Sequence, residues 1–166
     1  MVKANPPGDE TPAVNSYRKS VSFIERMYRH LLDMVAAELD RKSVNDVNSV
    51  QAMLLYNIGD SEVNAGELRS QGHYLGSNVS YNLKKLTQSN YVHAVRSSAD
   101  RRVVRVQLTE KGQHIRSLVS DLFVRQAIKL AEEAELAARD LEAANRVLAT
   151  LAHMWREQGV TGDGNN

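Results

Sequence analysis

The middle of the chain carries cationic side chains of the types that bind phosphate groups. Lys84 and Lys85 lie in the segment GSNVSYNLKKLTQSN, and Arg101 and Arg102 follow Asp100 in the segment RSSADRRVVRVQLTEKG. Lys and Arg neutralise phosphates and displace their counterions. A carboxylate one or two residues from an arginine can hold the guanidinium in one pose through a bidentate pair. These residue types favour a polyanionic partner, with nucleic acid first among the candidates.

The distribution of charge along the chain supports that partner. Net charge is only +1, but residues 64–112 carry 8 basic and 3 acidic side chains. Residues 1–63 carry 7 basic and 9 acidic side chains, and residues 113–166 carry 6 and 8. A basic segment between two acidic ones indicates a surface for a polyanion. The alternative is a solvated surface on which the charges cluster by chance.

The segment from Leu75 to Gln88 predicts a helix with one basic face. Leu75, Val79, Leu83 and Leu86 form an apolar stripe at helical spacing, which predicts the buried side. The opposite side carries Ser77, Asn78, Tyr81, Lys84, Lys85 and Gln88, and it has no carboxylate. Lysines there would contact phosphates, and Ser, Asn and Tyr would reach base edges or backbone oxygens in a major groove. The alternative is an ordinary solvated helix face.

Two alternating segments after this helix predict a β-hairpin. YVHAVR and RVVRVQL have a period of two and flank the turn SSAD. The tip of such a hairpin is narrow enough to approach a minor groove, where arginine is favoured by the negative potential. We expect either Arg101 or Arg102 to enter the groove while the other pairs with Asp100. The alternative is a surface ion pair at a turn, worth at most about 1 kcal/mol.

Amphipathic helices flank these elements, and the order of all the elements predicts a winged helix-turn-helix. The predicted order is helix, helix, short helix, helix, hairpin, long helix, helix. The fold class is therefore mainly α with a small β-hairpin wing, with N- and C-terminal helices that a second copy would cover. The expected parts are a disordered arm (1–15), an N-terminal dimerisation helix (16–45), the winged domain (46–112), C-terminal dimerisation helices (113–158) and a disordered tail (159–166).

Composition excludes several other classes of protein. The 166 residues are 42% hydrophobic and 25% charged, as in ordinary globular domains. There is no cysteine, so disulfides, cysteine-ligated zinc and thiol-based redox sensing are excluded. No segment reads as a signal peptide or membrane span, which predicts a cytoplasmic protein without a membrane partner. Motifs for catalysis are absent, so we expect no enzyme, no cofactor and no metal site.

The segment YVHAVRSSADRRVVRVQLTEKG resembles the wing signature of MarR-type winged-helix regulators, in which DRR precedes an alternating strand and LTxKG. ELRSQGHYLGSNVSYNLKKLTQSNYV is similar to that family's helix-turn-helix in length and apolar phase. HYLGSNVSYNLKKL also resembles LdtR-type alphaproteobacterial members. The resemblance implies a homodimeric bacterial transcriptional regulator on a pseudo-palindromic operator. Its recognition helices would enter major grooves of double-stranded DNA and its wing arginines the flanking minor grooves.

The resemblance also implies a small, anionic or aromatic effector bound between the dimerisation helices and the winged domain. Tyr28, Arg29, His30, Met53 and Tyr56 fall on the first two helices and could line such a cleft. Core filling is the competing interpretation of Tyr and Met at this spacing. The alternative function is a winged-helix adaptor that binds an acidic protein. Operator, target genes, effector identity and the sign of regulation, repressor or activator, stay open.

Overall fold

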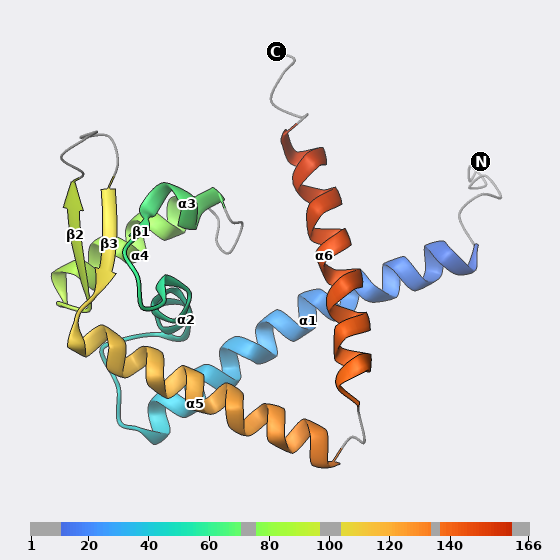
Figure 1. The fold of residues 1–166 in the computed structure, drawn as a ribbon, viewed down its shortest axis with the longest axis horizontal. Coiled ribbons are helices and arrows are strands. Elements are labelled where there is room, and N and C mark those ends of the chain that lie inside the picture. Colours follow the sequence, from blue (N-terminus) through green and yellow to red (C-terminus); the bar gives the residue numbers. More distant parts are fainter. Residues whose placement is uncertain (1–10, 71–75, 97–103, 134–136, 161–166) are drawn as a thin grey trace, which may run out of the picture. The chain divides into compact units, whose positions relative to one another are not determined.

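The computed structural model describes residues 11–70, 76–96, 104–133 and 137–160 (Figure 1). The elements are α1 (Pro12–Arg41), α2 (Ser49–Ile58), β1 (Val63–Asn64), α3 (Ala65–Ser70), α4 (Gly76–Gln88), β2 (Val92–Arg96), β3 (Val104–Leu108), α5 (Glu110–Glu133) and α6 (Ala138–Val160). This is the predicted order with one added strand. Contacts divide the chain into two compact units, Met1–Leu122 and Phe123–Asn166. The division by role into arm, winged domain and dimerisation helices stays a prediction.

Helix α1 begins earlier than the sequence predicted. Thr11 is its N-cap and accepts a hydrogen bond from the backbone N–H of Val14 at 3.4 Å, and Pro12 occupies the first turn. Proline suits that position because the first helical N–H groups have no partner within the helix. The expected disordered arm of residues 1–15 is therefore wrong for residues 12–15, because Pro12 begins a helix. Residues 1–10 lie outside the described part.

Both ends of α2 have local causes. The Asn48 side chain accepts a hydrogen bond from the backbone N–H of Gln51 at 2.9 Å, and the Gln51 side chain accepts one from the Asn48 N–H at 3.1 Å. This reciprocal pair is a capping box. Gly59 ends the helix at a φ of 73°. A side chain with a Cβ is disfavoured at that φ, so glycine fixes where α2 stops.

The wing is a three-stranded antiparallel sheet in the order β1-β3-β2, not a hairpin alone. The predicted pair β2–β3 aligns Val92 with Leu108 and Ala94 with Val106. Strand β1 pairs with the other edge of β3, with Val63 opposite Val106. Two residues are too few to show a period of two, which is why the sequence did not reveal β1.

The core of the first unit joins the C-terminal part of α1 to the winged helix-turn-helix. Its members are apolar side chains no more than 8% exposed, and they come from α1 (Val35, Leu39), α2 (Leu54, Leu55, Ile58), α4 (Val79, Leu83, Leu86), the sheet (Val92, Val106, Leu108) and the first turns of α5 (Ile115, Val119, Leu122). The stripe predicted for α4 is buried at these three positions. Leu75, the fourth, lies outside the described residues.

Many large apolar side chains are exposed on three of the helices. Large side chains more than a third exposed occur on α1 (Tyr17, Val21, Phe23, Met27, Tyr28), on α5 (Val124, Ile128, Leu130) and on α6 (Leu141, Val147, Leu148, Met154, Trp155). Helix α6 continues to Val160, so the expected tail is wrong for residues 159–160, and residues 161–166 lie outside the described part. Among the described helices, none is long and apolar enough to cross a membrane.

Candidate nucleic-acid interface

Helix α4 exposes the middle and end of the predicted basic face. Val79 and Leu86 are 1% and 2% exposed, whereas Tyr81 is 58% exposed and Lys84 and Lys85 are exposed. This follows from helix periodicity, since a buried stripe leaves the opposite side to solvent. Ser77 and Asn78 lie in α4, but their side chains are outside the described part of the structure. Their assignment as DNA contacts stays a prediction, as it does for the other three residues.

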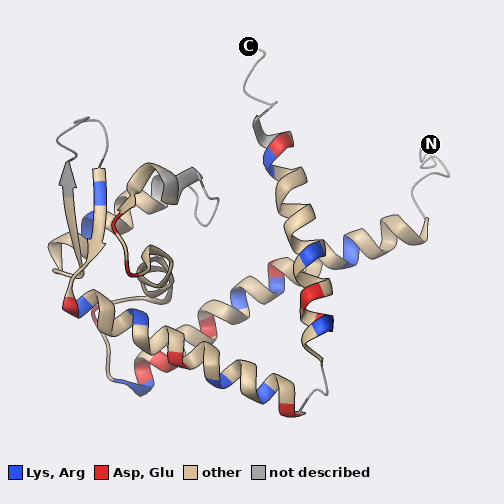
Figure 2. Cartoon of the chain, in the orientation of Figure 1, with Lys and Arg blue, Asp and Glu red and all other residues tan. Residues whose placement is uncertain are grey.

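Two residues of this face are already in contact. The ammonium of Lys85 lies 4.9 Å from the centroid of the Tyr81 ring, a cation–π arrangement one helical turn apart. The sequence of α4 contains no carboxylate to neutralise Lys84 or Lys85. By contrast, basic and acidic side chains occur together on α1, α5 and α6 (Figure 2). The exposed side of α4 is therefore a positive surface with an aromatic ring in it.

The three residues predicted for the wing tip, Asp100, Arg101 and Arg102, lie in the segment 97–103, outside the described residues. At the described base of the wing, Arg105 on β3 is exposed, and its Nη1 lies 3.6 Å from Oε2 of Glu62, just before β1. This ion pair was not predicted, because the pairing of β1 with β3 that brings the two residues together was not visible in the sequence.

The segment TEKG forms a joint against the turn that ends α4. The Thr109 hydroxyl donates to the carbonyl of Asn90 at 2.8 Å and accepts from the Gly112 N–H at 3.1 Å. The Thr109 N–H donates to the carbonyl of Tyr91 at 3.1 Å. Thr109 therefore caps α5 and also connects the first turn of α5 to the turn that ends α4.

A charged cluster reinforces this joint. Oδ1 of Asp46, in the α1–α2 loop, accepts a hydrogen bond from the Tyr91 hydroxyl at 2.6 Å, and Oδ2 accepts one from Nζ of Lys111 at 2.8 Å. The Lys111 ammonium also lies 4.0 Å from the centroid of the Tyr91 ring. Asp46 is 65 positions from Lys111, so no local pattern could have revealed the cluster.

The cluster perturbs all three of its titratable groups. The hydrogen bond from Lys111, and then that from Tyr91, holds the pKa of the Asp46 carboxyl below its usual value. Burial, and then the hydrogen bond to Asp46, raises the pKa of Tyr91. The hydrogen bond to Asp46 raises the pKa of Lys111. Each shift favours the protonation state that the three groups have at neutral pH: a carboxylate, a phenol and an ammonium.

A buried amide pair fixes α4 against α2. Nε2 of Gln51 donates to Oδ1 of Asn82 at 3.2 Å, and the two residues are 7% and 8% exposed. Because Gln51 also belongs to the capping box of α2, the N-terminus of α2 and the inner side of α4 share one hydrogen-bonded network. Asn82 was not singled out from the sequence, since an amide beside an apolar stripe gives no sign of its partner.

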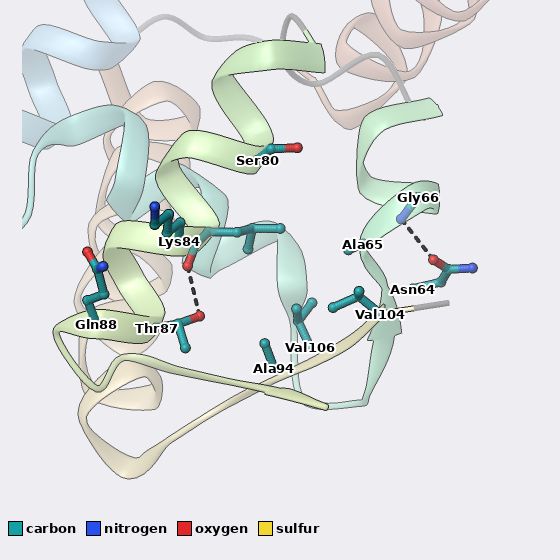
Figure 3. Close-up of a pocket in the computed structure, with 11 residues that line it drawn as sticks. Asn64, Ala65, Gly66, Ser80, Lys84, Thr87, Gln88, Ala94, Val104 and Val106 are labelled. Carbon is teal, nitrogen blue, oxygen red and sulfur yellow. Dashed lines mark hydrogen bonds between the residues drawn. The ribbon is translucent and has the colours of Figure 1, made fainter. Parts of the chain in front are cut away.

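A cavity of about 620 Å³ lies between α4 and the sheet. Ser80, Lys84, Thr87 and Gln88 of α4 line one side, and Ala94, Val104 and Val106 of the sheet, with Asn64, Ala65 and Gly66, line the other (Figure 3). Asn64 shapes this rim, because its side chain accepts from the Gly66 N–H at 2.8 Å and so caps α3. The side chain of Glu67, three residues after Asn64, is outside the described residues.

The five residues predicted to line an effector cleft do not line a common cavity among the described residues. Tyr28, Arg29 and His30 are exposed on α1, and Met53 and Tyr56 are half-buried on α2. Arg29 pairs with Glu25 at 3.5 Å. Neither of the two cavities described, that in Figure 3 and a polar one of about 460 Å³ beside Asp46 and Asn48, includes any of the five. The effector cleft stays a prediction.

The part of the chain that the structure describes contains no group of three or more His, Asp or Glu residues placed to hold a metal ion. His153 has a carboxylate neighbour, Glu157, at 3.5 Å, but both side chains are about 70% exposed on α6. Such an exposed pair supplies two ligands at most, fewer than a structural or catalytic metal site in proteins.

Comparison with known proteins supports the same interpretation of the winged region. Residues 47–112 match the family model described as a winged helix DNA-binding domain. Over 151 residues the chain is 37% identical to the exopolysaccharide II synthesis transcriptional activator ExpG of Rhizobium meliloti (strain 1021). That alignment covers 89% of this chain and 75% of ExpG.

Solved structures share the fold at low sequence identity. Streptococcus pneumoniae FabT, crystallised in complex with DNA, superposes with a TM-score of 0.67 at 20% identity, covering 86% of this chain and 99% of FabT. The C80S mutant of MarR from E. coli, complexed with operator DNA, gives 0.62 at 17% identity, covering 85% and 99%. Both are proteins crystallised on DNA.

Proposed function

Because the chain belongs to the MarR-type winged helix-turn-helix transcriptional regulators, we propose that it binds a pseudo-palindromic operator as a homodimer. DNA binding and transcriptional regulation are the function of this family, and its members are regulators, not enzymes. The assembly, the contact residues and the effector are the proposed parts. A regulator of bacterial DNA acts in the cytoplasm, which is where we place it.

The observation that carries the proposal is the exposed face of α4. Tyr81, Lys84 and Lys85 project from a helix whose other side is locked into the core, and no carboxylate of α4 opposes them. In the proposed complex Lys84 and Lys85 neutralise phosphates, while Ser77, Asn78 and Tyr81 meet base edges or backbone oxygens. On the wing, Asp100 holds one arginine of the pair Arg101 and Arg102 while the other enters the minor groove.

Homodimerisation is supported by the apolar side chains left in solvent. Met27 on α1 is 60% exposed, Ile128 on α5 is 53% exposed and Val147 on α6 is 56% exposed. Large apolar side chains exposed on a helix mark a protein interface more often than a free surface when several lie on that helix, as they do on each of these three helices. In the proposed dimer a second copy covers these helices and sets the distance between the two α4 helices at one turn of DNA, about 34–36 Å.

An effector that binds one dimer arrangement better than the other would change the affinity for DNA. We propose a small anionic or aromatic effector. One candidate site is the predicted cleft of Tyr28, Arg29, His30, Met53 and Tyr56. The second is the cavity of Figure 3. The second candidate is favoured by its volume of about 620 Å³, which is in the range of small-molecule sites, and by Lys84 on its rim.

The sign of regulation is proposed from the relative. ExpG is named as an activator, so we propose that this chain activates transcription as well. The measurement is the activity of a promoter fused to a reporter gene, with the promoter chosen because the purified chain binds it. Deleting the gene for this chain should lower reporter activity, and a rise in activity would identify a repressor instead.

The binding proposal is tested by the double substitution Arg101→Ala, Arg102→Ala. Gel shifts with genomic fragments should show sharply weaker binding, while analytical ultracentrifugation shows an unchanged dimer. Operator binding at wild-type affinity by this variant would refute the role of the wing. If the wild-type chain shifts no duplex DNA at low salt but retains an acidic protein partner, the chain is an adaptor and not a DNA-binding regulator.

A further inference from the structure

The recognition helix ends in a turn that has little freedom of its own. The N–H of Tyr91 donates to the carbonyl of Leu86 at 2.8 Å, and Asn90 has a φ of 60°. Tyr91 is 1% exposed and leads directly into β2. The end of α4 and the start of the wing are therefore fixed to each other through this turn.

The same turn is held by the first turn of α5. Thr109 bonds to the carbonyls of Asn90 and Tyr91, and Nζ of Lys111 lies 3.4 Å from the carbonyl of Ser89. A β-carbon at Gly112 would overlap the carbonyl oxygen of Tyr91, so this approach of the two backbones requires glycine. Helix α5 then continues to Glu133, beyond Ile128, which is proposed to meet the partner subunit.

Asp46 adds a third segment to this contact. Its two carboxylate oxygens are shared between the hydroxyl of Tyr91, on the turn, and the ammonium of Lys111, on α5. One carboxylate in the α1–α2 loop therefore holds the α4–β2 turn and the α5 helix to a common point. None of these three residues lies on the exposed face of α4.

We propose that Asp46, Tyr91 and Lys111 are positioning residues that set the angle between the recognition helix α4 and helix α5, and thereby fix the operator spacing that the dimer accepts. This inference rests on the proposed function, since a spacing exists only for two recognition helices. If the angle between α4 and α5 is fixed, the two α4 helices of the dimer have one separation, and operators with another half-site spacing bind more weakly. If the angle varies, the separation takes a range of values, so binding at the preferred spacing is weaker and the discrimination between spacings is smaller.

The substitution Asp46→Asn distinguishes this role from a direct contact of Lys111 with phosphate. Removing a negative charge near a DNA-binding surface strengthens binding to any duplex if only electrostatics acts. If Asp46 instead fixes the angle between α4 and α5, Asp46→Asn should bind more weakly, and only to the duplex with the preferred operator spacing. Asp60→Asn is the matched control, because Asp60 also pairs with an α5 side chain, Nη1 of Arg116, but does not touch the α4–β2 turn.

The experiment uses the full-length chain and the duplex that it enriches most strongly from a random-sequence pool. Affinity is measured for that duplex, for versions with one base pair inserted or deleted between the half-sites, and for an unrelated duplex. We expect Asp46→Asn and Lys111→Met to bind the enriched duplex about tenfold more weakly and to lose at least threefold of the spacing discrimination, with Lys111→Arg restoring most of both. Asp60→Asn should behave as wild type.

Equal changes on all four duplexes, or unchanged discrimination by spacing in Asp46→Asn, would overturn the inference while leaving the proposed function in place. The same holds if Asp60→Asn loses as much discrimination as Asp46→Asn. A wild-type chain that enriches no duplex, or only single half-sites, would instead refute the proposed dimeric regulator and this inference together. Circular dichroism of each variant at the assay temperature confirms that it is folded.

Discussion

Gly112 packs so closely on Tyr91 that a β-carbon at position 112 would overlap the backbone carbonyl oxygen of Tyr91. That carbonyl already accepts a hydrogen bond from the N–H of Thr109, so it cannot move away without breaking the bond. The glycine of the LTEKG segment is therefore required by a tertiary contact and not by its backbone dihedrals.

Gly112→Ala should destabilise the chain. Alanine is the better helix former by about 1 kcal/mol, but overpacking against a fixed backbone costs about 1–3 kcal/mol. We expect a lower melting temperature by differential scanning calorimetry and weaker DNA binding. Glu110→Ala, an exposed change in the same helical turn, is the control and should leave the melting temperature nearly unchanged. A more stable Gly112→Ala variant would mean that the turn at Tyr91 yields easily.

Removing one amide of the Gln51–Asn82 pair should lower the free energy of unfolding by more than the loss of one hydrogen bond alone, because the other amide is left buried without its partner. In Asn82→Leu the buried Nε2 of Gln51 loses its acceptor, and we expect the free energy of unfolding to fall by about 1–3 kcal/mol. The double variant Gln51→Leu, Asn82→Leu should lose less than the sum of the single variants, by about 0.5 kcal/mol or more. Urea unfolding of the four proteins measures both quantities, with Gln88→Leu as an exposed control. Strict additivity would contradict the coupling.

Lys84 and Lys85 should contribute to DNA binding through counterion release. Each phosphate contact contributes about 0.9 to the slope of log K against log salt concentration. In the proposed homodimer the double substitution Lys84→Gln, Lys85→Gln removes four phosphate contacts, two from each subunit. The slope should therefore become shallower by about 3.6, measured by fluorescence anisotropy between low and moderate salt. Lys19→Gln on α1 is the control and should leave the slope as in wild type. An unchanged slope in the double variant would remove both lysines from the interface.

The dimer should depend on the apolar side of α6. Leu148 is 42% exposed, and a carboxylate there would be buried without a partner in the proposed interface. We expect Leu148→Asp to shift the chain towards monomer at micromolar concentration in sedimentation velocity. Thr150, two residues further along the helix and on another side, provides the control Thr150→Asp. A monomeric wild-type chain would contradict the proposed assembly outright.

The Asp46 cluster should give stability a defined pH dependence. The pKa of Asp46 is lowered from its usual value of 3.8, so its contribution is present above that value and is lost as pH falls through the folded pKa. The pKa values of Tyr91 and Lys111 are raised from 10.0 and 10.5, so their contributions are lost only at higher pH. The difference in melting temperature between wild type and Asp46→Asn should be constant near neutrality and shrink in acid. A difference that grows on acidification would contradict the lowered pKa.

The amino-acid sequence determined the parts of this protein that depend on periodicity and on local caps. The buried stripe of α4, the strands β2 and β3, the glycine end of α2 and the Thr109 cap all follow from residues a few positions apart. The exposed basic face of α4 follows from the same pattern, because the side of a helix opposite its buried stripe is the side that faces solvent. Membership of the family then gave the DNA-binding function.

Only the tertiary structure decided which distant residues share a contact. Nothing near Asp46 in the sequence indicates that its carboxylate holds Tyr91 and Lys111, and nothing near Gln51 indicates Asn82. Strand β1 exists because β3 offers it a free edge, and Gly112 is needed because the chain returns to Tyr91. Periodicity shows which side of a helix or strand is buried. Which residue lies against that side depends on the packing of elements that are distant in the sequence.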